Sequence, residues 1–483
     1  MTQKKLTAAQ KDRAAGVLLG LASGDALGAG YEFGPPLQSS TPVVMKGGGG
    51  FNWSPGEWTD DTSMAVPIAQ AAAAGLDLRD ERVLDGIVAQ WVNWAKTAPD
   101  VGIQLRAILS RTEPTASAVR AVAKAHHERN GRSGGNGSLM RTAPVALAYL
   151  HDPAALAEAA RTLSSLTHYE ADAGDACVLW CLAIRHAVLH GEFDVRVGLA
   201  ALPADRRELW EGRIAVAETS EPKDFAHNGW VVEALQGAWS AISTTSQLDA
   251  THLRLALEAA VRGGRDTDTV AAIAGGLLGA RWGASAVPAK WRRIVHGWPK
   301  VNGASLTGAD LVRLGERICG DAQKERFDYS YLGDVSTLLQ HPHDEGVWIG
   351  AAGALEALPP EVDAVVSLCR VGTKQVPPHI RHHVEVRLID KDDPAENPNL
   401  DFVLVDTVDA IAALRAEGHT VLVHCAQAQS RTPSVAALYA ALHRGVAIDW
   451  ALRQVLEVLP RTTPKRFLRD AITRLATTEE TSK

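Results

Sequence analysis

Two clusters of threonine and aspartate constrain this chain more than any other feature of its sequence. Thr59-Asp60-Asp61-Thr62 and Asp266-Thr267-Asp268-Thr269 each stand directly before an alanine-rich run with helical spacing. One interpretation of either cluster alone is helix capping, because Asp and Thr before an apolar run are ordinary N-caps. Together, however, they supply four aspartates and several hydroxyls, which is more than capping requires. Such oxygen ligands suit hard cations, so the pair predicts a binuclear magnesium site.

The hydrophobic pattern before about residue 317 is helical. Apolar residues recur there at helix-length spacing, and glycine-rich segments interrupt the runs without any useful strand alternation. The pattern predicts an all-α domain. Helices are expected over residues 65–74, 83–95, 155–166, 176–189, 231–242, 253–261 and 270–282.

The pattern changes after about Cys319, where short strands alternate with helices. This alternation predicts a small α/β domain with helices on both faces of its sheet. Strands are expected over residues 347–350, 364–368, 384–389 and 420–423, and helices over 400–414, 433–442 and 451–459. A chain of 483 residues is long for one domain. We therefore expect a multidomain protein, with an all-α domain over 1–320, a linker over 321–345 and an α/β domain over 346–483. His341 and His343 flank a proline in this linker and predict a surface loop.

Two further segments of the first domain are rich in glycine. The segment 24–34 is interpreted as a flexible loop that holds the carboxylate of Glu32, because its glycines permit tight turns and close backbone approach. The segment 134–141 contains Asn136, Gly137 and Ser138, whose small side chains and backbone amides suit a phosphate group. The alternative for Asn136-Gly137 is a simple turn.

Composition narrows the possible partners. The formal charge of −7 provides no basic surface for an extended nucleic acid, and no apolar run approaches the length of a membrane span. The five cysteines are odd in number and lack zinc-ligand spacing, and Cys177 and Cys181 suit a buried helix face. A cytoplasmic location is expected by default.

The four segments resemble, in the same order, the motifs of the ADP-ribosylglycohydrolase family. These are Gly24-Asp25-Ala26-Leu27-Gly28 with Glu32, Trp58-Thr59-Asp60-Asp61-Thr62, Asn136-Gly137-Ser138-Leu139-Met140-Arg141 and Gly264-Arg265-Asp266-Thr267-Asp268-Thr269. The resemblance implies an all-helical fold and two magnesium ions, with manganese as a possible substitute. It also implies the metal ligands Thr59, Asp60, Asp61, Asp266, Asp268 and Thr269.

The same resemblance implies a hydrolase that removes ADP-ribose from an ADP-ribosylated protein or another ADP-ribosyl conjugate. Asn136, Gly137 and Ser138 would hold the phosphates of ADP-ribose. Glu32 matches a glutamate on a mobile loop, and both Glu32 and Asp61 are candidates for acid–base catalysis. His168 resembles a substrate-binding element more loosely, and a core or capping histidine remains the alternative.

The second domain contains a cysteine loop between a buried strand and a helix. Val421-Leu422-Val423-His424-Cys425 leads into a short loop, and Arg431-Thr432 opens the next helix. Loop amides and the helix N-terminus favour an anion, whether a thiolate or a bound phosphate. Arg431 adds a guanidinium that can bind phosphate in a bidentate manner.

This domain resembles the cysteine-dependent dual-specificity phosphatases over about residues 346–475. The resemblance implies Cys425 as the nucleophile, Arg431 as the phosphate ligand, His424 as the residue that positions the loop and Thr432 as the hydroxyl that assists the leaving thiolate. The general acid is expected after the strand ending at Ile389. Asp390 fits this position best, with Asp392 and Asp393 as alternatives.

One position departs from the phosphatase pattern. The family has glycine three residues after the cysteine, whereas this chain has Ala428. If the loop needs a positive φ there, alanine costs roughly 1 kcal/mol or more. We therefore carry two hypotheses for this domain. It either hydrolyses phosphomonoesters in phosphorylated substrates, or binds phosphate weakly or without catalysis and recruits phosphorylated partners.

Overall fold

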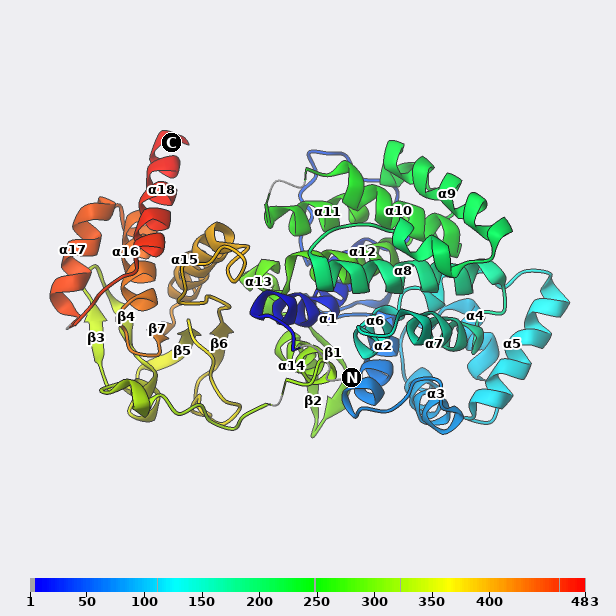
Figure 1. The fold of residues 1–483 in the computed structure, drawn as a ribbon, viewed down its shortest axis with the longest axis horizontal. Helices are drawn as coiled ribbons and strands as arrows, with labels where there is room; N and C mark the ends of the chain where they lie inside the picture. Colours follow the sequence, from blue (N-terminus) through cyan, green and yellow to red (C-terminus); the bar gives the residue numbers. More distant parts are fainter. Residues whose placement is uncertain (1–4, 111, 247–248, 322, 460, 483) are drawn as a thin grey trace. The chain divides into compact units, whose positions relative to one another are not determined.

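The computed structural model describes residues 5–110, 112–246, 249–321, 323–459 and 461–482, and it divides into two compact units. The first unit comprises residues 1–287 and 294–321, and the second comprises residues 288–293 and 322–483 (Figure 1). Each unit is described by itself.

The first unit is mainly helical. Among the described residues, no helix combines the length and apolar character needed to cross a membrane. Its helices are α1 (Ala8–Gly28), α2 (Asp60–Ala73), α3 (Glu81–Ala95), α4 (Ile103–Leu109), α5 (Ala116–Asn130), α6 (Ala143–Ala148), α7 (Pro153–Ser165), α8 (Ala171–His190), α9 (Ala204–Thr219), α10 (Val231–Thr244), α11 (Thr251–Arg262), α12 (Thr267–Trp282) and α14 (Gly308–Ile318).

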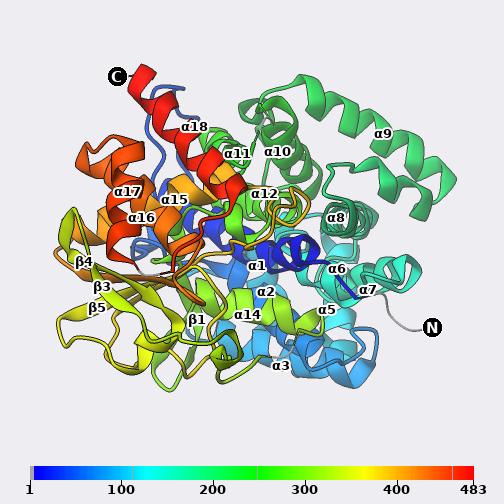
Figure 2. The same ribbon diagram turned by 60° about the vertical axis from the view of Figure 1, so that its left-hand side comes forward.

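Helices α1 and α12 pack at unusually close range, and they lie side by side in Figures 1 and 2. The contact face of α1 presents a glycine at every fourth position, namely Gly16, Gly20, Gly24 and Gly28. A Cβ atom at Gly20 would lie 2.2 Å from the carbonyl oxygen of Gly275, and one at Gly24 would lie 2.0 Å from that of Ala271. Glycine is therefore required here by backbone contact, since real Cβ atoms do not approach so closely.

This packing corrects the interpretation of the segment 24–34 as a loop. Residues 24–28 form the last turns of α1, and only the turn η1 (Ala29–Tyr31) and the residues after it leave the helix. Spacing by four residues places glycines on one helix face, where they allow a second helix to approach. The expectation of a flexible turn was wrong for residues 24–28, whereas the close backbone approach expected of these glycines is confirmed in their packing against α12.

A two-stranded ribbon also departs from the all-α expectation. Strands β1 (His296–Val301) and β2 (Ala304–Thr307) pair antiparallel around an Asn302-Gly303 turn, in which both residues have positive φ. Trp58 donates its backbone N–H to the His296 carbonyl at 2.9 Å and its Nε1–H to the Trp298 carbonyl at 3.1 Å. The ribbon thus fixes the chain just before the first Thr/Asp cluster.

The second unit is built on a five-stranded sheet in the order β3-β4-β7-β5-β6. Its strands are β3 (Leu338–His341), β4 (Asp344–Ala351), β5 (Val362–Ser367), β6 (His382–Glu385) and β7 (Thr420–Cys425), and only β3 runs antiparallel to its neighbour. Its helices are α13 (Ala289–Arg292), α15 (Leu400–Ala416), α16 (Arg431–Arg444), α17 (Ile448–Val458) and α18 (Arg466–Ser482). Strands β4, β5 and β7 confirm three of the four predicted strands in place.

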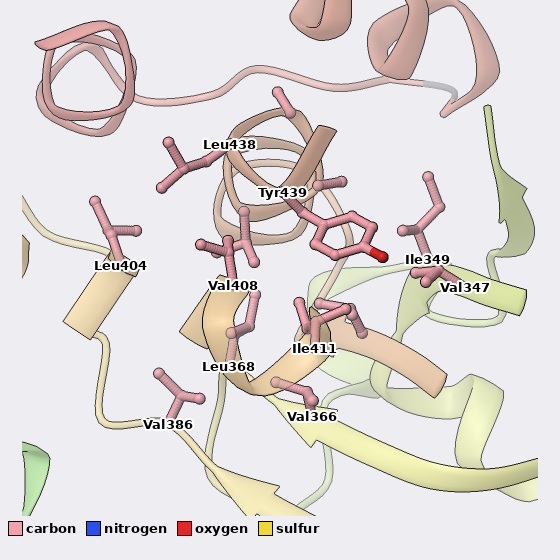
Figure 3. Close-up of a cluster of buried hydrophobic side chains, with 14 of the residues drawn as sticks. Val347, Ile349, Val366, Leu368, Val386, Leu404, Val408, Ile411, Leu438 and Tyr439 are labelled. Atoms are coloured by element: carbon pink, nitrogen blue, oxygen red, sulfur yellow. The ribbon is translucent and has the colours of Figure 1, made fainter. Parts of the chain in front are cut away.

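Helices α15 to α18 share one hydrophobic core with a single face of the sheet. Val347 and Ile349 of β4 meet Val408 and Ile411 of α15 there, beside Tyr439 of α16 (Figure 3). The other sheet face is covered by the short turn η8 (Ala352–Glu356) and by loop residues 371–380. The prediction of helices on both faces was wrong, because the connections around β5 are rich in proline and do not form α-helices.

The segment 321–345 contains more structure than a linker. It includes all of β3 and the first residues of β4. His341, expected in a surface loop, is buried, and its Nε2 lies 3.0 Å from the Ala436 carbonyl oxygen. Burial lowers the pKa of His341, so the ring is neutral and serves as a core residue.

A short stretch that precedes β1 in the sequence belongs to the second unit. Helix α13 packs against α15, where Ala289 enters the hydrophobic core. The Ala289 N–H donates to both carboxylate oxygens of Asp406, and Arg292 forms an ion pair with the same carboxylate at 3.2 Å. Arg293 pairs with Glu417 at the end of α15. The chain therefore leaves the first unit before α13 and returns to it after Arg293.

Candidate active sites

Three carboxylates from three helices of the first unit meet at one point. Asp25 lies in the last turns of α1, Asp61 in the first turn of α2 and Asp268 in the first turn of α12. All three are buried, and each offers an oxygen within 4.8 Å of the others. The close approach of α1 to α12 makes this meeting possible. Thr59 joins the cluster, since its Oγ1 donates to Asp61 at 3.0 Å.

A second group of carboxylates adjoins the first. Glu32, Asp100 and Asp268 also offer oxygens within 4.8 Å of one another. Glu32 follows η1, and its loop is tied to the second Thr/Asp cluster by two backbone hydrogen bonds, from Phe33 N–H to the Arg265 carbonyl and from Arg265 N–H to the Gly34 carbonyl. The sequence patterns of both clusters and of Glu32 thus converge on one site.

Helix capping does not account for these clusters. Thr59 and Asp266 occupy the N-cap positions of α2 and α12, but neither side chain makes a capping hydrogen bond. The first turn of α2 is capped instead by Asp25, which accepts from the Thr59 N–H at 2.8 Å and from the Thr62 N–H and hydroxyl. The aspartates of the clusters are therefore available for another role.

Several buried carboxylate oxygens have no hydrogen-bond partner among the described residues. These are Oε2 of Glu32, Oδ1 of Asp61 and Oδ1 of Asp268. Burial and then the neighbouring carboxylates raise the pKa of Asp61 and Asp268 well above the usual range, and the same causes raise the pKa of Glu32 to about 9. Unpartnered oxygens on mutually repelling, buried acids are the donor set that a hard divalent cation requires, so these residues fit such an ion.

Two asparagines orient the second cluster. Asn136 donates to Asp266 Oδ2 at 2.7 Å and to the Asn228 carbonyl at 2.9 Å. Asn228 in turn donates to the Gly264 carbonyl and accepts from the Asp266 N–H. The Asn136 side chain, predicted to bind substrate, is therefore engaged in holding a carboxylate of the cluster.

His168 lies against the glycine-rich segment. A Cβ atom at Gly137 would stand 3.2 Å from the ring of His168. Arg141 donates to Thr167 Oγ1 at 2.6 Å, and the Thr167 hydroxyl forms a hydrogen bond with His168 Nδ1 at 2.8 Å. Burial lowers the pKa of His168 well below its usual value, which makes the ring neutral, and its Nε2 lies beside the glycines.

The Ser138 side chain points into the core of the first unit. Its hydroxyl is buried and accepts from Ser164 Oγ at 2.9 Å, with Cys177 Sγ at 3.6 Å. The hydroxyl is thus bound within the core of the first unit, and the backbone of this segment is the part that remains suited to a phosphate.

The second unit contains a cavity of about 300 Å³ at the cysteine loop. Cys425 ends β7, and Arg431 opens α16 after five loop residues. The cavity is lined by Leu332, Asp390, Cys425, Ala426, Gln427, Gln429, Ser430, Arg431, Thr463 and Lys465. The structure therefore brings together the predicted nucleophile, phosphate ligand and general acid.

Hydrogen bonds fix the groups around the cysteine. Arg431 donates through Nη1 to the carbonyls of Leu368 and Leu388, and its buried Nε has no partner among the described residues. Ser367 Oγ lies between His424 Nε2 at 2.7 Å and His383 Nε2 at 2.9 Å. Burial, with His383 nearby, lowers the pKa of His424 to about 3, so this ring is a neutral support of the loop. The Thr432 hydroxyl, buried below the loop, donates to the Gly350 carbonyl at 3.3 Å.

Asp390 is distinguished from its two alternatives by position. It lines the cavity and accepts a hydrogen bond from Ser430 Oγ at 2.9 Å. Asp393 instead pairs with Lys391 and accepts from the Ala395 N–H, and neither Asp392 nor Asp393 lines the cavity. Among the three, the geometry favours Asp390.

Ala428 adopts the conformation that the family glycine would provide. Its φ is +58°, in the left-handed region, where a non-glycine residue pays about 1–2 kcal/mol. Ala428 is 2% exposed and belongs to the hydrophobic core that α15 to α18 share with the sheet, and burial of one methyl contributes about 0.8 kcal/mol. Core packing thus offsets much of the strain, and the loop retains a positive φ at this position.

Comparison with known proteins identifies the family of the chain. Residues 6–328 match the family model described as ADP-ribosylglycohydrolase. The chain belongs to the ADP-ribosylglycohydrolase family. The resemblance drawn from the four motifs is confirmed.

Two relatives of this glycohydrolase chain are matched over most of their own length. One is the ADP-ribosylarginine hydrolase Tri1 of Pseudomonas putida (strain GB-1), 32% identical over 289 residues, which cover 58% of this chain and 73% of that protein. Another is the ADP-ribosyl-[dinitrogen reductase] glycohydrolase of Rhodospirillum rubrum, 30% identical over 292 residues, which cover 58% of this chain and 89% of the relative. A smaller part of the glycohydrolase chain is similar to the dual specificity phosphatase 28 of Mus musculus, at 36% identity over 115 residues, 24% of this chain and 68% of the phosphatase.

Three residues of the first site were missed by sequence reasoning. Asp25 belongs to the motif Gly24-Asp25-Ala26-Leu27-Gly28, but no role was assigned to it. Its place in the last turn of a helix was the feature that could have indicated one. Asp100 follows a proline in the loop before α4, and Asn228 lies in the loop before α10. Neither of these two has a local pattern that marks it, because only the fold brings them to the carboxylates.

Proposed function

We propose that the first unit is a magnesium-dependent hydrolase that releases ADP-ribose from an ADP-ribosylated arginine. The observation that carries this proposal is the set of partnerless carboxylate oxygens where α1, α2 and α12 meet, beside Glu32. Arginine as the acceptor is supported by the names of relatives and by charge, since a guanidinium leaving group suits a site rich in carboxylates.

The cations would be held by both clusters, through Thr59, Asp60, Asp61, Asp266, Asp268 and Thr269. When bound, magnesium supplies positive charge that neutralises the carboxylates and orients the ribose hydroxyls. Asn136 keeps Asp266 in place, and Asp25 fixes the start of α2. Manganese has a similar preference for oxygen ligands and is the expected substitute.

The chain's own groups account for the remaining chemistry. Cleavage at the anomeric carbon passes through an oxocarbenium-like state, whose positive charge is favoured by the surrounding acids. Glu32 would take the proton of the attacking water or protonate the leaving nitrogen, with Asp61 as the alternative. His168 would donate its Nε2–H beside the glycine-rich segment, where the diphosphate of ADP-ribose is expected.

The test is release of ADP-ribose from an ADP-ribosylated arginine peptide, followed by chromatography. We expect release with magnesium and its loss in excess EDTA, restored by added magnesium or manganese, because the carboxylates need the cation. A matched ADP-ribosylated serine peptide should be cleaved more slowly. No release with magnesium from any ADP-ribosyl conjugate would refute the proposal, and undiminished release in EDTA would refute the metal requirement.

The second unit is proposed to be a cysteine-dependent phosphatase. The Cys425 thiolate attacks phosphorus, and an S–P bond forms as the ester P–O bond breaks. Asp390 gives its proton to the leaving alcohol, then takes a proton from the water that cleaves the S–P bond and releases orthophosphate. Arg431 would bind the phosphoryl oxygens, supported by its unpartnered buried Nε.

Hydrolysis of p-nitrophenyl phosphate tests this second activity. We expect turnover by the full chain and its loss in Cys425→Ser, because a serine hydroxyl is far less ionised than a thiol. ADP-ribose release by Cys425→Ser should be unchanged, because the substitution lies in the other unit. Turnover that survives in Cys425→Ser would contradict the mechanism. Binding of phosphopeptide without turnover would favour the alternative, a phosphate-binding module that recruits phosphorylated partners.

A further inference from the structure

The cavity of the second unit contains a cation that the proposed phosphatase chemistry does not use. Two of its lining residues are positively charged, Arg431 and Lys465. Residues 426–430 of the cysteine loop are Ala-Gln-Ala-Gln-Ser and contribute no charge. Lys465 comes from a different segment, which connects α17 to α18. Arg431 and the loop amides are sufficient for one phosphoryl group, so Lys465 is left over.

The segment that carries Lys465 is bound firmly to the cysteine loop. The Thr463 N–H donates to the Gln429 carbonyl at 2.9 Å, and the Lys465 N–H donates to Ser430 Oγ at 3.2 Å. Ser430 Oγ donates in turn to Asp390 Oδ1. The backbone of Lys465 is therefore fixed with respect to both the loop and the proposed general acid.

The ammonium group of Lys465 lies beside Asp390 and stays accessible. Lys465 Nζ is 3.7 Å from Asp390 Oδ1 and donates to the Asp390 carbonyl, while its side chain is 48% exposed. When Asp390 carries the proton that it gives to the leaving alcohol, it no longer offers Lys465 a full negative charge. Lys465 is then a cation at the cavity without a fully charged partner, and it can bind an anion there.

We propose that Lys465 binds a second anionic group of the substrate, next to the phosphoryl group at Cys425. This inference rests on the phosphatase proposed above and specifies its substrate class, a phosphomonoester whose alcohol carries a further phosphate or diphosphate. Such a group occurs in ADP-ribose 1″-phosphate and in a doubly phosphorylated peptide. The first source is favoured, because the same chain contains a unit of the ADP-ribosylglycohydrolase family.

The experiment compares Lys465→Gln with the unaltered full chain on matched substrates. Ribose 1-phosphate and ADP-ribose 1″-phosphate share the scissile group, but only the second has a diphosphate. We expect kcat/KM of Lys465→Gln on ADP-ribose 1″-phosphate to fall about 10- to 30-fold further than on ribose 1-phosphate, the usual effect of one charge-assisted hydrogen bond. Lys465→Arg should restore most of the loss.

Two controls locate the effect. Lys391→Gln removes an exposed lysine that pairs with Asp393 and Glu396 outside the cavity, and it should change neither substrate's kcat/KM. A peptide in singly and doubly phosphorylated forms provides a second matched pair. A selective loss on the peptide pair alone would assign the second anion to phosphopeptides. An equal fall on both members of every pair, or no fall on any, would overturn the proposal.

Failure of the phosphatase itself would be recognised separately. If the unaltered chain hydrolyses none of these compounds, calorimetry on Cys425→Ser, with and without Lys465→Gln, still measures binding of the same pairs. Ligand bound by the first unit contributes equally to both chains, so their difference reports on the second unit. Weaker binding of only the second-anion compound supports the subsite, and equal binding by both chains overturns it.

Discussion

Replacing Asp268 with asparagine is expected to abolish ADP-ribose release while leaving the fold intact. Asp268 takes part in both carboxylate groups of the first unit, and its Oδ1 has no partner among the described residues. Asparagine keeps the shape but removes the charge that would hold the cation. A metal contributes several kcal/mol to such a transition state, so the expected loss at saturating magnesium is on the order of 1,000-fold in kcat.

The same variant should melt at a higher temperature than the parent when both are in EDTA. Without a cation, burial and the neighbouring carboxylates raise the pKa of Asp268 and make its ionised form costly, and the neutral amide avoids that cost. The melting temperature measured by calorimetry should therefore rise, while the rate of ADP-ribose release falls. Asp205→Asn, at an exposed position in the first turn of α9, is the matched control and should alter neither. Full activity of Asp268→Asn would remove this residue from the metal site.

Replacing Gly24 with alanine is expected to destabilise the first unit severely. The new Cβ would lie 2.0 Å from the Ala271 carbonyl oxygen, which belongs to a helix backbone and cannot turn aside. Helices α1 and α12 must then separate, at a cost of roughly 3 kcal/mol, and the melting transition of this unit should fall by about 5–10 °C. ADP-ribose release should fall as well, because Asp25 follows Gly24 directly and would move away from Asp268.

Gly212→Ala provides the opposite case. Gly212 lies within α9, and a Cβ atom there would meet nothing within 4 Å. Since alanine favours a helix over glycine, this variant should gain about 0.5–1 kcal/mol. Phosphatase activity of the second unit, measured on the same preparations, should be unaffected by either substitution. A Gly24→Ala chain as stable as the parent would show that the glycine contact is not needed.

Local patterns in the sequence predicted which residues meet at both candidate sites better than they predicted the surroundings of those sites. The Thr/Asp clusters and the cysteine loop are contiguous motifs, so their residues could be read without the fold. Asp100 and Asn228 reach the first site only through long-range packing, which one sequence does not reveal. Gly24 and Gly28 were expected in a loop, because glycine permits both a turn and a close helix contact and one sequence does not distinguish the two. Their actual partners are almost 250 residues away, on α12.

The position of Ala428 shows a different limit. The sequence located the departure from the phosphatase pattern and the physical cost of a positive φ. The structure adds that the same methyl group is buried in the core, which is a compensation that no local pattern displays. The prediction of helices on both sheet faces failed for a similar reason, since the alternation of strands and helices does not show which connections form an α-helix.

The course of the chain through α13 bears on the modularity of this protein. A gene fragment that begins at residue 322 would encode the whole sheet and α15 to α18, yet it would omit the arginine that neutralises Asp406 and the alanine buried against α15. The second unit therefore cannot be transferred intact to another protein as one continuous segment of the chain. Whatever the history of the fusion, its junction has become part of the interior of one of the joined units.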